Sequence, residues 1–262
     1  MTLAGMSPVL AALIAGSVAA GATAVGTLPA LFARHLERHL QDALLGFGAG
    51  IMLAASAVSL VLPGLEEARR QGAGPWGAGA IVGVSILAGA ALILALDHLV
   101  PHEHFIKGPE GGSPQRLKRA WLFVFAICLH NLPEGLAIGV GYAAGDLSHG
   151  TALATGIAIQ DLPEGLVIAL ALIAVGYGRA WSLMVGMVSG LIEPVGAVAG
   201  ASLVTAVPVL LPCGLGFAAG AMLYVVSHEV IPESHRQGHE HFATAGLMCG
   251  FVLMMVLDTA LG

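Results

Sequence analysis

The sequence has little charge, few aromatic residues and only three cysteines. Charged side chains make up 10% of the 262 residues and aromatic side chains 5%, whereas a soluble globular domain carries about 25% charge. This scarcity excludes an ordinary soluble domain. Cys128, Cys213 and Cys249 are odd in number and widely spaced, so they indicate no disulfide framework and no thiolate metal motif. No basic stretch interleaved with aromatic residues is present, which argues against a nucleic-acid partner.

Long apolar runs take the place of the missing charge. Hydrophobic residues make up 57% of the chain, and the mean hydropathy is +0.88. A run of about 20 apolar residues can cross a hydrocarbon core of about 30 Å as a helix, the element that satisfies its own backbone in lipid. We therefore predict an all-α, multi-pass membrane protein with one transmembrane domain over residues 1–262. The eight expected spans are residues 8–31, 42–62, 76–100, 121–143, 151–175, 179–204, 209–226 and 242–261.

Lysine and arginine are unevenly divided between the two sides of this arrangement. Only Arg69 and Arg70 fall on one side. The other side receives Arg34, Arg38, Lys107, Arg116, Lys118, Arg119, Arg179 and Arg236. The positive-inside rule makes the richer side cytoplasmic. We therefore expect a cell (inner) membrane protein with both termini on the outer side and a cytoplasmic His-containing basic loop at residues 101–119.

An internal repeat refines the architecture. Residues 46–53 read GFGAGIML and residues 216–223 read GFAAGAML, with six of eight positions identical. Each copy runs on to a proline at the expected helix end, Pro63 and Pro232. The predicted topology makes the two copies cross the membrane in opposite directions. Inverted repeats of this kind are a common construction of secondary transporters.

Two related motifs place polar side chains inside apolar spans. The first reads HNLPEG at residues 130–135, and the second reads QDLPEG at residues 160–165. Helical spacing puts the first and fifth residues of each motif on one face, and both motifs fall near the bilayer midplane. Glu193 in the next span reaches about the same depth. The seven side chains expected in this plane, our candidate metal ligands, are His130, Asn131, Glu134, Gln160, Asp161, Glu164 and Glu193.

Four carboxyl groups at this depth require compensation. Each costs about 2.5 to 3.5 kcal/mol at the centre of a membrane helix, and no lysine or arginine lies in the central turns of these spans. Protons or bound cations must therefore neutralise them. Carboxylate, amide and imidazole ligands suit Zn²⁺, Fe²⁺, Mn²⁺, Co²⁺ or Cd²⁺ rather than Cu⁺. Pro133 and Pro163 each lack a backbone donor, which leaves a carbonyl one turn earlier as a further ligand.

The paired motifs, followed by a glutamate in the next span, resemble those of the Zrt/Irt-like (ZIP) divalent metal transporters, particularly the bacterial members. The resemblance implies zinc as the substrate, with cadmium, iron, manganese and cobalt as further metals and none of them a catalytic cofactor. It also implies an inverted repeat of helices one to three and six to eight around helices four and five, and a bundle of helices one, four, five and six that slides to carry metal inward. Gln160 stands where many relatives have histidine and Asp161 where asparagine might stand, which leaves the preferred metal open.

The resemblance further implies a binuclear site. One ion would be bound by His130, Glu134, Gln160 and Glu164. The other would be bound by Asn131, Glu134, Asp161, Glu164 and Glu193. In this arrangement Glu134 and Glu164 bridge the two ions.

Other polar residues are candidates for the transport path. Met52 and Ser56 in the second span would line the way in, although packing is the ordinary role of such a methionine, and Asp97 would belong to the way out. Histidines and glutamates also gather on the expected inner side, where we expect them to receive released metal, His228 and Glu229 first. The clusters are His98, His102, Glu103 and His104 after the third span, and His228, Glu229, His235, His239, Glu240 and His241 before the eighth.

Two other functions use the same residue types. An intramembrane metalloprotease also buries His and Glu one turn apart, but HEVIP at residues 228–232 lacks the second histidine of HExxH. A metal-independent proton-conducting membrane protein would use the carboxyl groups as proton sites. We expect a transporter and no enzyme, with the lipid bilayer and divalent metal ions as its partners. The sequence leaves the oligomeric state open, with a homodimer as one candidate.

Overall fold

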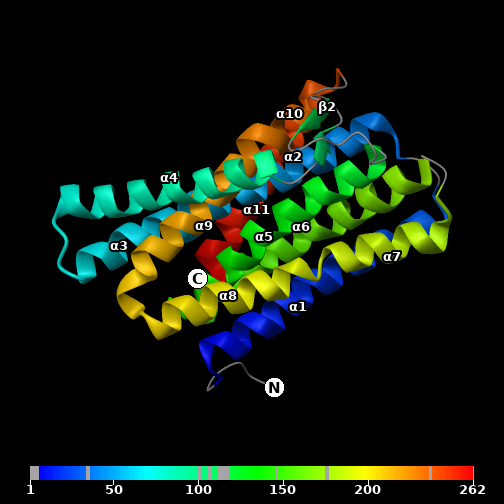
Figure 1. Ribbon diagram of the computed structural model, residues 1–262. Coiled ribbons are helices and arrows are strands. Elements are labelled where there is room, and N and C mark those ends of the chain that lie inside the picture. The colour runs from blue at the N-terminus through cyan, green and yellow to red at the C-terminus, as the bar shows by residue number, and fades with distance from the viewer. Residues whose placement is uncertain are drawn as a thin grey trace.

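The computed structural model is a bundle of long helices with α5 and α6 in its middle (Figure 1). It describes residues 6–33, 36–99, 102–104, 108–110, 119–144, 147–174, 177–235 and 238–261, without the side chains of residues 97, 102–104, 108–110, 119–127 and 174. The elements in chain order are α1 (Pro8–Thr27), η1 (Leu28–Leu31), α2 (Arg38–Ala54), η2 (Ala55–Val61), α3 (Leu62–Arg70), α4 (Pro75–Leu99), β1 (His102–His104), β2 (Gly108–Glu110), α5 (Arg119–Ala143), α6 (Leu147–Ala174), α7 (Arg179–Ser189), α8 (Ile192–Ala206), η3 (Pro208–Leu210), α9 (Leu211–Val225), η4 (Val226–Val230), α10 (Ile231–Ser234) and α11 (Glu240–Leu261).

Seven helical segments within the described residues are long and apolar enough to cross a membrane. They are Pro8–Leu31, Arg38–Arg70, Pro75–Leu96, Leu147–Ile173, Arg179–Ala206, Pro208–Ser234 and Glu240–Leu261. The prediction of an all-α, multi-pass membrane protein is confirmed, and the described residues add only a small antiparallel hairpin of β1 and β2. Helix α5 has 25 residues, which is long enough for a span. If α5 crosses the membrane, the number of spans is eight, and this count stays a prediction.

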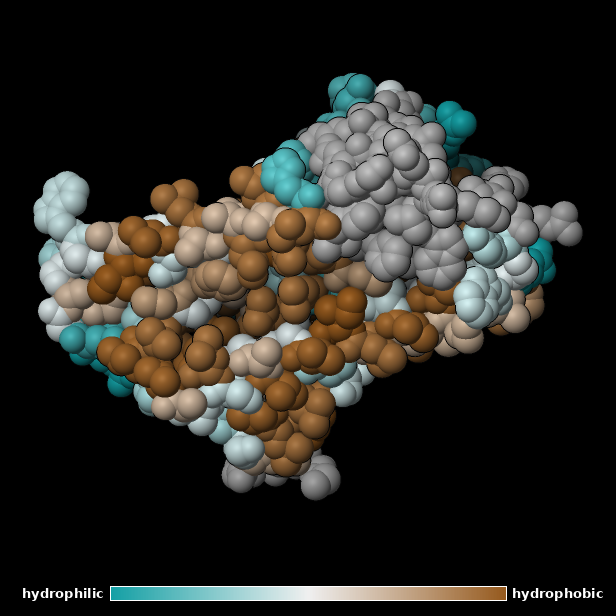
Figure 2. Space-filling model, in the orientation of Figure 1, coloured by the Kyte–Doolittle hydropathy of each residue, from teal (hydrophilic) through white to brown (hydrophobic). Residues whose placement is uncertain are grey.

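The outer surface of the bundle carries the apolar side chains that a lipid environment requires. Brown, hydrophobic residues cover the middle of the molecule, and teal, hydrophilic residues gather toward its ends (Figure 2). Large aliphatic residues of α1, α4, α8 and α11 are exposed along this middle zone. Trp76 and Phe32 are the most exposed aromatic residues in the described part of the chain, at 93% and 88%. Each lies at a helix end, where the headgroup region accommodates aromatic rings.

The helices pack as two groups. In one, α5 runs along α8, and α1 packs against both α6 and α8; in the other, α2 runs along α11 and α4 along α9. Figure 1 shows α1, α7 and α8 on one side of the bundle and α3 and α4 on the other. The start of α1 and the end of α11 lie toward the same end as the α3–α4 and α8–α9 connections (Figure 1). The first and last described helices therefore have these ends on one side of the bundle, and the predicted outer location of both termini stays a prediction.

The sequence repeat has a structural counterpart. In each copy an α-helix runs into a π-helix and then into another α-helix, as α2–η2–α3 and as α9–η4–α10. The two sequence copies, residues 46–53 and 216–223, are offset by 170 residues. Under this offset the residues of η2 correspond to those of η4. Under the same offset, the α2–α11 pair corresponds to the α9–α4 pair, which matches the observed packing. These correspondences support the inverted repeat that we predicted.

The proline positions correct one of our predictions. We expected Pro63 and Pro232 to end their helices, but each is the second residue of a further helix, α3 or α10. The backbone stays helical across each junction, because Val61 and Val230 both have right-handed helical φ and ψ angles. The preceding π-helix takes up the irregularity instead. The second and seventh spans are therefore longer than predicted, to Arg70 and Ser234.

The sixth span is broken, which the sequence reading did not predict. Helix α7 ends at Ser189 and α8 starts at Ile192, with a turn between them. Pro194 explains the break, because its ring would clash with the carbonyl of Gly190 in a continuous helix. Glu193 consequently lies in the first turn of α8 and not in mid-helix. The positive end of the helix dipole favours a carboxylate there.

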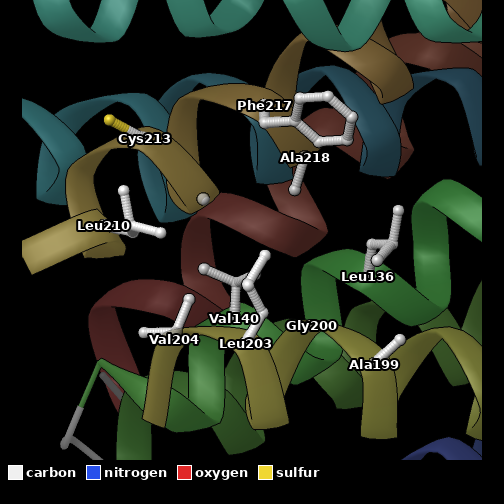
Figure 3. A pocket seen from close by; sticks show the side chains of 11 residues that line it. Leu136, Val140, Ala199, Gly200, Leu203, Val204, Leu210, Cys213, Phe217 and Ala218 are labelled. Carbon is white, nitrogen blue, oxygen red and sulfur yellow. The ribbon is translucent and has the colours of Figure 1, made fainter. Parts of the chain in front are cut away.

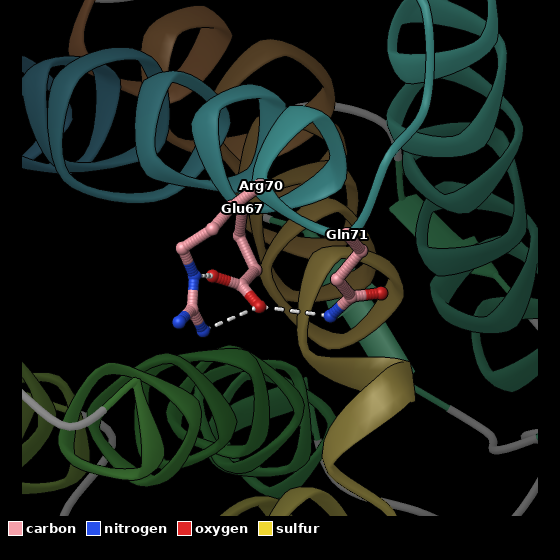
Figure 4. Close-up of polar contacts among 3 residues, drawn as sticks. All are labelled: Glu67, Arg70 and Gln71. Carbon is pink, nitrogen blue, oxygen red and sulfur yellow. Dashed lines mark hydrogen bonds and ion pairs between the residues drawn. The ribbon is translucent and has the colours of Figure 1, made fainter.

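A polar cluster closes the end of α3. Arg70 donates from Nε and Nη2 to the two carboxylate oxygens of Glu67, at 2.5 and 2.9 Å (Figure 4). Gln71 donates to the same carboxylate at 2.8 Å. Because Arg70 is largely exposed, these contacts add little stability, but they fix the last turn of α3 ahead of the turn at Gly72.

Candidate metal centre

The two motifs face each other across adjacent helices. Helix α5 supplies His130, Asn131 and Glu134, and α6 supplies their counterparts thirty residues later, Gln160, Asp161 and Glu164. Helix α8 adds Glu193. Pro133 and Pro163 lie inside helices that continue past them, so both motifs stay on regular helical faces. The predicted ligands other than His130 and Glu164 are almost fully buried.

Three carboxyl groups form the centre of the site. Ligand oxygens of Glu134, Asp161 and Glu164 all lie within 4.8 Å of one another. The carboxyl groups of Asp161 and Glu193 are close enough to share a hydrogen bond. Four acidic groups from α5, α6 and α8 therefore converge. Such a concentration of buried negative charge requires cations or protons, because α6, α8 and the described middle of α5 contain no lysine or arginine.

Hydrogen bonds orient the polar groups from behind. The Gln160 amide donates to Glu134 Oε1, and the Thr23 hydroxyl of α1 donates to Glu193 Oε1 at 3.2 Å. Asn131 Nδ2 donates to the carbonyl of Ser189 at 3.1 Å. That carbonyl is available because the α7–α8 break redirects the N–H of Glu193 to Gly190. In both amide groups the nitrogen is therefore engaged as a donor and the oxygen is left without a partner among the described residues.

One oxygen of each of six predicted ligands is buried without a hydrogen-bond partner among the described residues. These atoms are Asn131 Oδ1, Glu134 Oε2, Gln160 Oε1, Asp161 Oδ2, Glu164 Oε1 and Glu193 Oε2. An unsatisfied buried oxygen normally costs about 1 to 3 kcal/mol, and buried polar groups are nearly always paired. Six such atoms from three helices at one place form a set of hard oxygen donors suited to divalent cations.

The glycine that ends each motif explains how the helices approach so closely. A Cβ at Gly135 would lie 2.3 Å from the carbonyl oxygen of Glu193, and a Cβ at Gly165 would lie 2.1 Å from that of Thr23. Only glycine allows backbones to meet at this distance. Gly135 thereby sets α8 with Glu193 against α5, and Gly165 sets α1 with Thr23 against α6. The motif carries both the ligands and the close helix contact that positions their partners.

Comparison with known proteins assigns the chain to a family. A family model described as ZIP zinc transporter matches residues 111–258, which include both motifs and Glu193. The chain belongs to the ZIP zinc transporter family. It is 53% identical to zinc transporter ZIPB of Bordetella bronchiseptica over 261 residues, covering 96% of this chain and 81% of that protein. It is 45% identical to zinc transporter GufA of Myxococcus xanthus, covering 96% and 99%, and 33% identical to human zinc transporter ZIP11, covering 99% and 100%.

Membership of the ZIP family confirms the resemblance read from the sequence. The names of these relatives describe transport proteins and not enzymes, which agrees with our prediction. The chain is accordingly a multi-pass membrane transporter of divalent metal ions.

His130 lies apart from the other predicted ligands in one respect. Its Nε2 contacts Glu229 Oε2, and Glu229 belongs to the π-helix η4. The contact joins the metal-site helix α5 to the other helix group of the ZIP fold. His228 stacks on Tyr224, with ring centroids 5.0 Å apart. Glu229 was predicted as a release residue, and this contact places it next to the site.

The roles of the other path residues stay predictions. Met52 and Ser56 are buried one turn apart on α2 and η2, and the Ser56 hydroxyl donates to the Met52 carbonyl at 2.7 Å. Their role on the way in stays a prediction. Asp97 lies in the last turn of α4, but its side chain is outside the described part of the chain. The described part of the chain also leaves out most of the basic loop at residues 101–119, including Lys107, Arg116 and Lys118. It leaves out the side chains of His102, Glu103 and His104, and the residues Arg34 and Arg236.

A second polar contact set, which the sequence reading missed, joins the π-helix η2 to two other spans. The Ser59 hydroxyl of η2 donates to Asp258 Oδ1 of α11 at 2.8 Å. His149 at the start of α6 contacts the Ser59 carbonyl through Nε2 at 2.8 Å and Asp258 through Nδ1 at 3.5 Å. Ser59 corresponds to Glu229 under the 170-residue offset. The two π-helices of this ZIP chain therefore both carry polar contacts to the motif helices α5 and α6.

Thr23 is a second residue that the sequence reading missed. A lone threonine in an apolar helix gives no signal of its own. The repeat offset provides one, because residue 23 plus 170 is residue 193, so Thr23 occupies the position of Glu193 in the other half. The two side chains are hydrogen-bonded in the structure. Extending the repeat to the first span would have found it.

Proposed function

We propose that this chain transports divalent transition-metal ions, zinc first, into the cytoplasm through a binuclear site at the bilayer midplane. The two ions would use the two ligand sets that the ZIP resemblance implies, with Glu134 and Glu164 as bridging ligands. The observation that carries the proposal is the convergence of four carboxyl groups from α5, α6 and α8, each with one buried oxygen that has no partner among the described residues. Four carboxyl groups match the charge of two divalent ions.

The arrangement of the helices supports a sliding mechanism. The ligands belong to α5, α6 and α8, which pack with α1 as one group, the same spans as in the moving bundle that the family resemblance implies. The contact of α5 and α8 with α9 is lined by apolar residues at one place. A hollow of about 280 Å³ lies there, lined among others by Leu136, Val140, Leu203 and Phe217 (Figure 3). An apolar, loosely filled contact offers few polar bonds to break when one group moves past the other.

Zinc uptake into proteoliposomes tests the function. The purified chain should accumulate radioactive zinc, and cadmium, iron and manganese should compete with it in proportion to their affinity. The same vesicles should cleave no peptide and conduct no protons in metal-free buffer. Peptide cleavage would favour the metalloprotease alternative, and proton conduction without metal would favour the proton-conducting alternative. Vesicles without zinc uptake above that of empty liposomes would refute the proposed substrate.

Glu193→Gln is expected to weaken the binding of one ion far more than the binding of the other. The substitution keeps the size of the side chain and its bond from Thr23, but removes a charge assigned to only one of the two ions. We expect the affinity for that ion to fall at least about tenfold. Anomalous diffraction from cadmium-soaked crystals, compared with the unchanged chain, measures the occupancies. Two ions at full occupancy in the variant would contradict the assignment.

Zinc uptake is expected to fall as the external pH drops from about 8 to about 5. Metal binding requires ionised carboxylates and neutral His130, so protons compete with metal for the same atoms. The decline should be steeper at low zinc concentration and should be overcome by added zinc. Initial uptake rates at several pH values measure it. A pH profile that stays flat at subsaturating zinc would count against direct competition at the site.

The orientation of the chain is part of the same proposal. Both termini should lie on the outer side of the cell membrane. The start of α2, the end of α10 and the β1–β2 hairpin should lie on the cytoplasmic side. Eight spans, with α5 as the fourth, place the motif helices in opposite directions. A fluorescent protein fused after residue 262 should then stay dark if exported unfolded, whereas alkaline phosphatase in that place should be active.

A further inference from the structure

We propose a second divalent-metal site, formed by Asp42 and His239 with His39 as a third ligand, at the end of the bundle that carries α10 and the β1–β2 hairpin. It is built on the α2–α11 pair and shares no residue with the midplane centre. Its metal class is the divalent transition ions that accept mixed carboxylate and imidazole ligands, zinc and cadmium among them.

Asp42 is the central observation. It is a fully buried aspartate in the second turn of α2. Its Oδ2 contacts His239 Nδ1 at 3.1 Å, while its Oδ1 is buried without a partner among the described residues. A buried carboxylate that uses only one of its two oxygens is costly. A cation at this position would satisfy the second oxygen.

The distance between the two groups fits a shared metal ion. Zinc binds imidazole nitrogen and carboxylate oxygen at about 2.0 to 2.2 Å, so two ligand atoms of a tetrahedral ion lie about 3.3 Å apart. The observed 3.1 Å between Asp42 Oδ2 and His239 Nδ1 differs little from that value. The same pair can exist as a plain hydrogen bond when no metal is bound, so the ligands are already in place.

His39 supplies the third ligand. It lies three residues before Asp42, hence on the same face of α2, and its ring centroid is 6.2 Å from that of His239. Phe242 packs against both imidazole rings, at 5.1 and 6.5 Å. His39 now contacts Glu37 at 3.3 Å, and both of these side chains are substantially exposed. A rotation of the His39 side chain toward Asp42 would therefore break only a contact that is exposed to solvent.

The two supporting helices hold the ligands rigidly. The carbonyl of His239 accepts the N–H groups of Phe242 and Ala243, at 2.9 and 3.2 Å, which fixes His239 at the start of α11. Gly238 precedes it with φ of +85°, a left-handed conformation that favours glycine and turns the chain onto α2. A Cβ at Gly46 would lie 2.1 Å from the Ala243 carbonyl oxygen. Preformed ligands on backbones in contact are the arrangement that a metal site needs.

Accessibility is consistent with metal arriving from solution. The His239 side chain is 34% exposed, whereas Asp42 is not exposed at all. An ion would therefore reach the imidazole first and bind the carboxylate beneath it. The site lies at the end that we propose to be cytoplasmic, but its existence does not depend on that orientation or on transport through the midplane.

Cadmium binding to a chain with a disabled midplane centre tests the site. Glu134→Gln together with Glu164→Gln removes both bridging ligands, and cadmium retained after desalting is counted by mass spectrometry. We expect about one ion per chain to remain. Adding His239→Gln or Asp42→Asn should weaken this binding at least about tenfold, whereas Ala245→Gln, which places the same side chain at an exposed position of α11, should leave it unchanged.

Thermal unfolding separates a metal site from a plain hydrogen bond. Glutamine at position 239 can still donate to Asp42, so the metal-free variant should unfold near the temperature of the parent, but cadmium should no longer stabilise it. If the disabled chain does not fold, the same three variants in the otherwise unchanged chain serve, with one fewer ion expected for His239→Gln than for Ala245→Gln. Equal cadmium binding in those two variants, or none in the disabled parent, would overturn the proposal.

Discussion

Replacing Glu134 with alanine is expected to reduce zinc uptake to background, by at least about 100-fold. Loss of a residue that merely supports a ligand costs about 10- to 100-fold in metal affinity, and Glu134 is proposed to bridge both ions. The side chain is fully buried among the carboxyl groups of Asp161 and Glu164. Its removal also frees the Gln160 amide that donates to it. Initial rates of radioactive zinc uptake into proteoliposomes, at equal protein content, measure the effect.

The matched control is Glu66→Ala, which removes an exposed glutamate from α3 and should leave uptake within about twofold of the unchanged chain. Glu164→Ala should abolish uptake as Glu134→Ala does, because both carboxylates are proposed to bridge. The alanine variants should still elute as folded protein. Each removes a buried carboxylate that no protein cation neutralises when metal is absent. Uptake at the unchanged rate in either bridging variant would refute the binuclear arrangement.

The general architecture could be predicted because each membrane span must meet its requirements alone. A span needs about 20 apolar residues whatever its neighbours do, so composition and run length placed the spans. The cluster of carboxyl groups could be predicted for a related reason, because a carboxylate in an apolar helix is costly enough to require a function. Two such motifs thirty residues apart and Glu193 in the next span, all at one depth, left few alternatives.

Local irregularities could not be predicted from apolar runs. The π-helices at Ala55–Val61 and Val226–Val230 change the hydrogen-bond register without changing hydropathy. The break before Ile192 was in principle readable from Pro194, whose clash with a carbonyl four residues earlier is a rule of backbone geometry. The same clash rule applies to Pro133 and Pro163, but both lie inside continuous helices. Tertiary packing therefore decides which proline breaks its helix.

The roles of single polar residues outside a motif could not be predicted either. Thr23 and Asp42 each stand alone in the sequence, and we placed Asp42 at the start of a span without assigning it a role. The structure gives each a partner from a distant segment, Glu193 for Thr23 and His239 for Asp42. Pairings between residues 170 and 197 positions apart depend on which helices pack together, and a hydropathy pattern does not contain that information.

The second large effect is expected at the glycines that end the two motifs. Gly135→Ala and Gly165→Ala should each lower the thermal unfolding temperature by about 5 °C or more and cut zinc uptake at least about tenfold. The added Cβ would lie 2.3 Å from the Glu193 carbonyl oxygen in the first variant and 2.1 Å from the Thr23 carbonyl oxygen in the second. Backbone atoms cannot rotate away, so α5 must separate from α8, or α6 from α1.

Such separation moves ligands as well as helices. Gly135 adjoins Glu134 and faces Glu193, so a shift there displaces a bridging ligand from a ligand of the second ion. Gly79→Ala in α4 is the matched control, because a Cβ at Gly79 meets no atom within 4 Å and alanine is the better helix former. It should leave uptake unchanged and the unfolding temperature equal or slightly higher. Motif variants that behave like Gly79→Ala would show that close contact between these helices is not what holds the metal ligands together.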